Sequence, residues 1–223
     1  MKVFIAGDST AACKEENKRP ETGWGEKLGL FFDKNVIIRN FAKNGRSSKS
    51  FMNEGLLDLI DKEINENDYL FIQFGHNDGK PNPDRHTTFE EYQDNLMKYA
   101  NVALSHKATP IFLTSISRRR FKEDKTLDIN TVEIYPEACK DFCKKNNFIC
   151  LDMYTRTYNL LKDMGYEDST KLFLQLRPHE NDNYPDGVID NTHLNDFGAT
   201  VIASIVIDEL KKVNTDLVKH INQ

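Results

Sequence analysis

A serine near the start of the chain and a histidine near its end have the settings expected of a nucleophile and its base. Ser9 lies in Gly7-Asp8-Ser9-Thr10, directly after the apolar run 3–6. A tight turn after a strand exposes a serine hydroxyl, and the adjacent backbone N–H groups can stabilise an oxyanion. Taken by itself, the tripeptide Gly7-Asp8-Ser9 is more typical of a turn serine or a helix N-cap. A catalytic interpretation therefore depends on partners elsewhere in the sequence.

A nucleophilic serine needs a base, and the base needs an acceptor that orients it. His193 lies three residues after Asp190, in a stretch that we expect to form one turn before the last helix. This spacing lets the Asp190 carboxylate accept a hydrogen bond from Nδ1–H of His193 while Nε2 faces Ser9. The alternative is that Asp190 forms a turn and His193 belongs to a helix cap. Among the six histidines we prefer His193, because of its neighbouring carboxylate and its place between sheet edge and helix.

An acyl-transfer site also needs hydrogen-bond donors for the developing oxyanion. Gly45 can offer its backbone N–H because no side chain obstructs a close approach. Asn77 can offer its side-chain amide. Each of these residues taken singly is a common turn former, so their weight as candidates comes from where the fold places them.

Five short apolar runs alternate with amphipathic segments along the chain. Runs of this kind are expected of strands covered on both faces, and they occupy residues 3–6, 36–41, 69–74, 111–115 and 148–151. Strand–helix alternation predicts right-handed crossovers and a parallel sheet with helices on both sides. In such folds, chemistry collects at the carboxyl ends of the strands. Ser9, Gly45 and Asn77 each follow one of the first three strands, so this topology brings them to one edge of the sheet.

The composition is that of one globular domain, which we expect to span residues 1–223. A chain of 223 residues can bury a continuous core without disulfide bonds or structural metal ions. Hydrophobic residues make up 39% and charged residues 29%, and the formal net charge is −5. Without a basic excess we expect no binding to nucleic acid, and without an apolar run of about 20 residues we expect no membrane span. An enzyme or a ligand-binding domain remains.

The cysteines and the N-terminus add two expectations. Cys13, Cys139, Cys143 and Cys150 lack the paired spacing of a zinc knuckle, so we expect buried free thiols. Free thiols are typical of a reducing compartment. The chain starts directly with the first strand and shows no secretory signal. We expect a cytoplasmic protein, or a secreted one if a signal has been removed.

The joint pattern resembles the SGNH/GDSL hydrolase superfamily, which is named after a serine, a glycine, an asparagine and a histidine. The resemblance runs from Gly7 to about Ala199 and is greatest to the rhamnogalacturonan acetylesterase-like branch. The segments that carry it are Gly7-Asp-Ser-Thr10, Gly23-Trp-Gly25, Asn44-Gly-Arg-Ser-Ser48, Gln73-Phe-Gly-His-Asn-Asp78, Tyr135-Pro136 and Asp190-x-Thr-His-Leu194. The full set is far more specific than any one segment.

The resemblance implies a three-layer α/β/α sandwich with a five-stranded parallel sheet, the flavodoxin-like architecture of this superfamily. It implies Ser9 as nucleophile, His193 as general base and then acid, and Asp190 as the orienting carboxylate. The Ser9 N–H, the Gly45 N–H and the Asn77 side chain would form the oxyanion hole. The implied reaction is hydrolysis of O-acetyl esters on a small-molecule or oligosaccharide substrate of pectic, rhamnogalacturonan type. It would pass through an acetyl-serine intermediate, without a metal or another cofactor.

Three further residues are candidates for contacts with an acidic sugar. Arg46 lies beside Gly45, His76 lies in the loop after the third strand, and Arg118 begins a run of three arginines after the fourth. A guanidinium can bind a uronate carboxylate through two parallel hydrogen bonds. The alternatives are a solvated basic surface for the arginines and a loop-holding hydrogen bond for His76. The polar stretch 177–187 is expected to be a surface loop, with a substrate-side lid as the alternative.

Other functions remain open for the same residues. A lipase or thioesterase of the same superfamily would need an apolar groove or an amphipathic surface helix, and neither is clear in the sequence. A non-catalytic carbohydrate-binding protein on the same fold would not need all four hallmark residues. A nucleotide-binding domain is disfavoured because both glycine-rich phosphate-binding motifs are missing from the sequence.

Overall fold

A central sheet of five parallel strands organises the protein, whose computed structural model describes residues 1–222. The strands are β1 (Lys2–Gly7), β2 (Ile37–Asn40), β3 (Tyr69–Gln73), β4 (Thr109–Leu113) and β5 (Ile149–Leu151). They lie in the order β2-β1-β3-β4-β5. Each of the five predicted runs is a strand, with ends that shift by two residues at most. The predicted parallel sheet is therefore confirmed.

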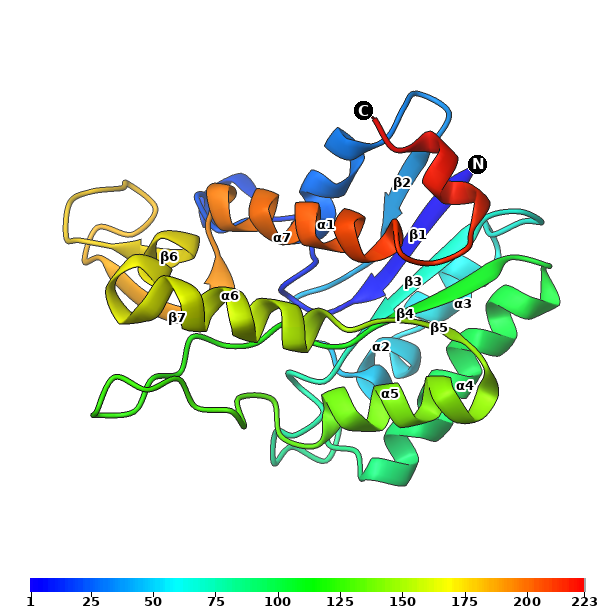
Figure 1. The fold of residues 1–223 in the computed structure, drawn as a ribbon, viewed down its shortest axis with the longest axis horizontal. Coiled ribbons are helices and arrows are strands. Elements are labelled where there is room, and N and C mark those ends of the chain that lie inside the picture. Colours follow the sequence, from blue (N-terminus) through cyan, green and yellow to red (C-terminus); the bar gives the residue numbers. More distant parts are fainter. Residues whose placement is uncertain (223) are drawn as a thin grey trace.

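Helices cover both faces of this sheet and give three layers (Figure 1). One face carries α1 (Trp24–Lys27), α6 (Met153–Asp168) and α7 (Asp196–Leu210). The other face carries α2 (Ser48–Asn53), α3 (Leu56–Asp61), α4 (Phe89–Ser105) and α5 (Tyr135–Asn146). Short 3-10 turns lie at Glu16–Lys18, Leu28–Phe31, Ser169–Leu172 and Asp216–His220.

The alternation of side chains along β1 explains why there are two cores. Val3 and Ile5 point into the core under α1, α6 and α7, whereas Phe4 and Ala6 point into the core under α2 to α5. All four side chains are fully buried. Successive side chains of a strand point to opposite faces, so a strand covered on both sides needs a continuous apolar run. This requirement is what made the sheet predictable.

A second, two-stranded antiparallel sheet lies outside the main one. Its strands are β6 (Phe173–Leu176) and β7 (Val188–Leu194). It lies at the far left of Figure 1, beyond the end of the main sheet to which the arrowheads of β1 and β2 point. β7 leads directly into α7, so this hairpin is attached to a helix that packs in the main core.

The spacing of Asp190 and His193 predicts one turn, whereas the structure puts both residues on β7. The expected turn is therefore wrong. The strand escaped prediction because most of its residues are only partly buried, so that polar residues occupy it and no continuous apolar run marks it. Short apolar runs on either side of Pro185-Asp186-Gly187 were the signal that was available for a hairpin.

The loop between β6 and β7 is fixed to the N-terminal part of the chain. The side-chain amide of Asn183 donates to the carbonyls of Glu16 and Arg19, both at 2.9 Å. The hydroxyl of Tyr184 donates to the carbonyl of Lys18 at 3.0 Å. This predicted surface loop therefore has a defined position against a distant segment.

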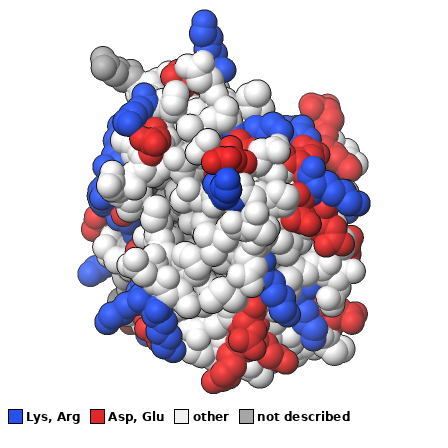
Figure 2. Space-filling view, turned by 90° about the vertical axis from the view of Figure 1, so that its right-hand side faces the viewer, with Lys and Arg blue, Asp and Glu red and all other residues white. Residues whose placement is uncertain are grey.

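Charged side chains of both signs are mixed on the face that Figure 2 shows, which is the right-hand side of Figure 1. The loops leading into β3 and β4 lie on that side, opposite the hairpin. Within residues 1–222, every helix is too short or too polar to cross a membrane.

Candidate active site

Ser9, His193 and Asp190 form a continuous chain of contacts. Ser9 Oγ lies 3.0 Å from Nε2 of His193, and Nδ1 of His193 lies 2.6 Å from Oδ2 of Asp190. Ser9 follows the end of β1, and the other two residues lie on β7. The structure thus brings together three residues that the sequence analysis selected from opposite ends of the chain.

Asp190 is also held by backbone donors of its own strand. Its Oδ1 accepts from the N–H groups of Thr192 at 2.7 Å and His193 at 2.9 Å. Partial burial by itself raises the pKa of Asp190, but the hydrogen bonds from His193 and Thr192 outweigh burial and lower the pKa to about 2. Because the carboxylate is ionised at neutral pH, Nδ1 of His193 carries the hydrogen of their shared bond. Nε2 is then free to accept from the Ser9 hydroxyl.

A buried network lies behind Ser9 and fixes its turn. Oδ1 of Asp8 accepts from the backbone N–H and the hydroxyl of Thr10, both at 2.8 Å, and Oδ2 lies 2.9 Å from Nδ1 of His76. Burial raises the pKa of Asp8, but the contacts with His76 and Thr10 outweigh it, so the pKa lies below its usual value. A charged carboxylate therefore anchors the serine turn from inside the protein.

Lys14, which the sequence analysis did not select, ties this turn to the next loop. Its ammonium donates to the Ser9 carbonyl and to Oδ1 of Asn44, both at 2.6 Å, and lies 2.8 Å from the Glu21 carboxylate. Asn44 directly precedes Gly45, so the lysine fixes the serine turn relative to the glycine loop. Nothing in the sequence distinguishes this buried lysine from the surface lysines of the chain.

Three hydrogen-bond donors remain available at the site. Among residues 1–222, neither the Ser9 N–H nor the Gly45 N–H donates to another protein group. Nδ2 of Asn77 donates one hydrogen to the Arg46 carbonyl at 3.0 Å, which leaves its second hydrogen free. Gly45 has a φ of +76°, a left-handed conformation that glycine adopts without strain. The glycine and asparagine loops thus converge with the serine turn, as predicted from the topology.

These groups line a cleft of about 440 Å³ between the loops of the main sheet and the β6–β7 hairpin. Most of the lining residues are polar or charged, and Leu174, Tyr184 and Val188 add apolar side chains. The other lining residues are Ser9, Lys18, Glu21, Asn44, Gly45, Asn77, Lys80, Asp190 and His193. Such a lining suits a polar ligand with a small apolar group better than a long acyl chain.

Two of the three predicted substrate contacts are occupied by other protein groups. The Arg46 guanidinium donates to the Glu54 carboxylate at 2.9 and 2.6 Å. His76 is buried, and its two ring nitrogens lie 2.9 Å from Asp8 and from the carbonyl of Ile116. These contacts correspond to the loop-holding alternative for His76, and neither side chain lines the cleft at Ser9.

Three cations without ion-pair partners lie around the cleft. Lys80 lines it, and the Arg85 guanidinium lies 3.5 Å from where a Cβ on Gly45 would be. Arg118, the third predicted contact, donates to the His76 carbonyl at 2.8 Å and lines an adjoining cleft of about 390 Å³. Burial, together with the charges of Arg118 and Arg85, lowers the pKa of Lys80. In the part of the chain described, none of the three cations forms an ion pair.

The fold and this set of residues define a class of ester hydrolases. The family model described as GDSL-like Lipase/Acylhydrolase matches residues 3–206, and the chain belongs to this family. The predicted membership of the SGNH/GDSL hydrolases is thereby confirmed. Rhamnogalacturonan acetylesterase RhgT of Bacillus subtilis is 38% identical over 222 residues, which cover 99% of this chain and 94% of that protein. The probable rhamnogalacturonan acetylesterase YesY of the same organism is 29% identical over 221 residues, or 98% of this chain and 96% of YesY.

A solved structure supports the same fold. Protein YxiM of Bacillus subtilis matches 95% of this chain with a TM-score of 0.79 and 23% sequence identity. The match covers 56% of YxiM, so this chain spans little more than half of that protein. The predicted α/β class with a five-stranded parallel sheet is confirmed.

Proposed function

We propose that this protein is a carbohydrate O-acetylesterase that acts on rhamnogalacturonan-type oligosaccharides containing uronate. The observation that carries the proposal is the chain of contacts from Asp190 through His193 to Ser9, which ends in a cleft with three unused donors. Ser9 is the nucleophile, His193 is the base and then the acid, and Asp190 orients the imidazole. The names of RhgT and YesY support the acetyl and sugar parts of the proposal.

In the acylation step, Nε2 of His193 takes the Ser9 hydroxyl proton while Oγ attacks the acetyl carbonyl carbon. The negative charge that develops on the carbonyl oxygen is stabilised by the Ser9 N–H, the Gly45 N–H and the Asn77 amide. The tetrahedral intermediate then collapses. His193 gives its proton to the departing sugar oxygen, so the sugar leaves as an alcohol and the acetyl group stays on Ser9.

Deacylation repeats the same proton transfers with water in place of the sugar. Nε2 of His193 removes a proton from water as the water oxygen attacks the acetyl-Ser9 carbonyl. The same three donors stabilise the second oxyanion. His193 returns the proton to Ser9 Oγ, and acetate leaves. The Asp190 carboxylate stabilises the imidazolium in both steps without taking its proton.

The three unpaired cations favour an acidic sugar. Lys80 and Arg85 lie next to the proposed oxyanion site, and Arg118 lies in the adjoining cleft. Crowded cations without carboxylate partners repel one another, and a uronate carboxylate would relieve that repulsion through charge-assisted hydrogen bonds. We assign carboxylate recognition to these residues and not to Arg46, whose guanidinium is already bound to Glu54.

The first experiment measures acetate release from acetylated rhamnogalacturonan oligosaccharides, acetylated xylo-oligosaccharides and p-nitrophenyl esters of increasing chain length. We expect the rhamnogalacturonan oligosaccharides to be preferred, and acetate to be preferred over octanoate. Ser9→Ala should lower kcat by at least about 10⁴-fold, whereas Ser105→Ala, on the exposed side of α4, should behave as wild type. A Ser9→Ala protein with the wild-type rate contradicts the mechanism, and a preference for octanoate favours the lipase alternative.

The second experiment tests the acidic substrate. We expect Lys80→Met and Arg85→Gln each to lower the ratio of kcat/KM for uronate-containing over neutral acetylated oligosaccharides by about tenfold, the value of one hydrogen bond to a charged group. Lys34→Met, an exposed lysine just before β2, is the matched control. An unchanged ratio in both variants would remove the uronate from the proposal and leave the acetylesterase activity in place.

A further inference from the structure

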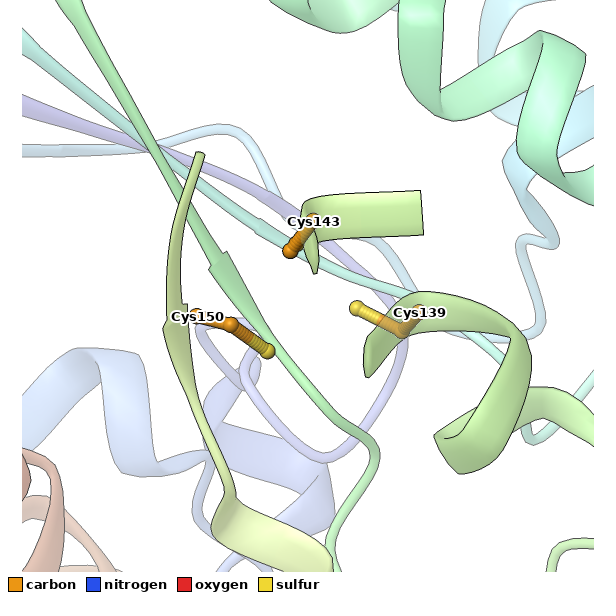
Figure 3. Close-up of side chains that lie close together, drawn as sticks. All are labelled: Cys139, Cys143 and Cys150. Atoms are coloured by element: carbon orange, nitrogen blue, oxygen red, sulfur yellow. The ribbon is translucent and has the colours of Figure 1, made fainter. Parts of the chain in front are cut away.

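Three cysteine sulfur atoms converge at one edge of the main sheet, away from the residues of the proposed esterase site. Cys139 and Cys143 lie one helical turn apart on α5, and Cys150 lies on β5, the strand at the edge of the sheet (Figure 3). All three Sγ atoms lie within 4.8 Å of one another. The sequence predicts buried free thiols for all four cysteines. Cys13, the fourth, is in fact exposed.

On its inner side this cluster, which we call the cysteine cluster, is surrounded by apolar side chains, while Cys150 is only partly buried. Cys139 and Cys143 are buried in the core under α2 to α5, and Cys150 packs against the same core. Phe112 and Phe142 belong to that core too, and Phe148 packs against it, with the three rings in mutual contact. On that inner side water finds few polar partners beside the sulfur atoms.

The sulfur positions fit a three-coordinate metal ion. With metal–sulfur bonds of about 2.3 Å, the sulfur atoms of a trigonal site lie about 4.0 Å apart. The cluster reaches that spacing if its widest pair closes by less than about 1 Å. The three ligands come from two elements that already pack against each other, so the site is largely formed before an ion binds.

The number and kind of ligands select among metal ions. Within residues 1–222, no histidine or carboxylate joins the three sulfur atoms. Structural zinc sites use four ligands, and within residues 1–222 the group of ligand atoms that lie within 4.8 Å of one another holds only the three sulfur atoms. Thiolate ligands favour soft ions, and Cu(I) is the soft ion that a purely sulfur site selects.

We propose that Cys139, Cys143 and Cys150 form a binding site for one Cu(I) ion, independent of the esterase reaction. Each thiol that becomes a copper-bound thiolate releases one proton, and copper enters and stays as Cu(I), so no oxidant is consumed. The site does not touch the cleft at Ser9, whose lining contains no cysteine among the described residues. The proposal therefore stands or fails separately from the proposed function.

The test is an anaerobic titration of the reduced full-length protein with Cu(I), buffered by a chromophoric Cu(I) chelator. We expect one equivalent to bind in wild type and in Cys13→Ser. In Cys143→Ser and in Cys150→Ser the affinity should fall by at least about 100-fold, because losing a thiolate ligand should cost at least as much as the roughly 10–100-fold lost with a residue that only supports a ligand. Circular dichroism and hydrolysis of p-nitrophenyl acetate check that each variant is folded.

X-ray absorption at the copper edge keeps the test independent of whether the variants fold. In the wild-type complex we expect three sulfur neighbours at about 2.3 Å and no nitrogen or oxygen neighbour. Failure of the wild type to compete with the chelator overturns the proposal, and so does loss of binding in Cys13→Ser alone. A four-coordinate spectrum, or Zn(II) binding as tight as Cu(I), overturns the three-coordinate assignment.

Discussion

The two carboxylate oxygens of Asp190 have different partners, and this difference makes its role testable. Oδ1 is held by the N–H groups of Thr192 and His193, while Oδ2 faces Nδ1 of the imidazole. Asp190→Asn keeps an oxygen for the backbone donors and presents an amide nitrogen to the ring. Because that nitrogen cannot accept a hydrogen bond, His193 has to carry its hydrogen on Nε2 and can no longer accept the Ser9 proton.

For Asp190→Asn we therefore expect kcat/KM on p-nitrophenyl acetate to fall by about 10³–10⁴-fold, as expected for the wrong histidine tautomer. The thermal midpoint should change little, because the backbone contacts of Oδ1 are kept. Asp182→Asn, on the exposed loop between β6 and β7, is the matched control. A wild-type rate in Asp190→Asn would mean that another group orients His193.

Asn77 tests the oxyanion site at the same scale. One hydrogen of its amide is bound to the Arg46 carbonyl and the other is free for the transition state. Removing one such donor costs about 10²–10³-fold in kcat, with little change in KM, because the charge exists only in the transition state. We expect this pattern for Asn77→Ala in steady-state kinetics and no effect for Asn53→Ala, whose side chain is exposed at the end of α2. A rise in KM at constant kcat would instead place Asn77 in ground-state binding.

At the scale of elements, the strands that could be predicted are those marked by a short run of apolar residues. The central strands β1, β3 and β4 were visible because nearly all their residues are buried, and the edge strands β2 and β5 were visible as short apolar runs although they are only partly buried. Their order brought Ser9, Gly45 and Asn77 to one edge, so the loops of the candidate site could be inferred from topology. The β6–β7 hairpin lies outside this sheet and has mixed, partly exposed residues, so no periodic signal marked it.

Contacts between distant loops were not predictable in the same way. Lys14 and Arg85 reach the site from segments without a motif, and Cys150 joins Cys139 only because β5 packs against α5. In each case a residue of common type acquires its partners from the three-dimensional fold. Sequence spacing cannot predict contacts of this kind. It could predict the contact between Asp190 and His193, because these two residues are close in the chain.

Asp78 gives a prediction for the junction between the β3 loop and α2. Its Oδ1 accepts from the backbone N–H of Ser48 at 3.0 Å and from the Ser48 hydroxyl at 2.6 Å. Burial is the largest influence on this carboxyl, and it raises the pKa to about 7. In the unfolded chain the pKa of an aspartate is about 3.9. The folded state therefore binds the proton more tightly, so this group favours folding below about pH 4, and that contribution is lost as the pH rises toward 7.

We expect the thermal midpoint of the wild type to fall between pH 5 and pH 8, and Asp78→Asn to reduce that fall. A chain of this size loses roughly 2–4 °C for each kcal/mol of stability, so calorimetry at the two pH values can resolve the difference. Asp163→Asn, an exposed residue on α6, controls for general charge effects. An equal pH dependence in wild type and Asp78→Asn would show that Asp78 does not titrate in this range.

At the scale of the whole molecule, the candidate site joins the two ends of the chain. Ser9 and His193 are 184 residues apart and lie within hydrogen-bonding distance. The residues after the site add to the same core, since α7 is largely buried and Leu217 is fully buried beyond it. We infer that the site is not divided between two independently folding parts.

We therefore propose that residues 1–223 unfold as one cooperative unit. The core under α1, α6 and α7 draws side chains from β1 near the start of the chain and from Leu217 near its end, so opening either end exposes the same apolar surface. The expected result is a single calorimetric transition whose van't Hoff and calorimetric enthalpies agree. Loss of esterase activity, far-ultraviolet circular dichroism and tryptophan fluorescence should coincide in a urea titration, with the sole tryptophan, Trp24, reporting on that core. Activity lost at a lower urea concentration than the other two signals would show that the β6–β7 hairpin, which carries Asp190 and His193, opens before the sheet.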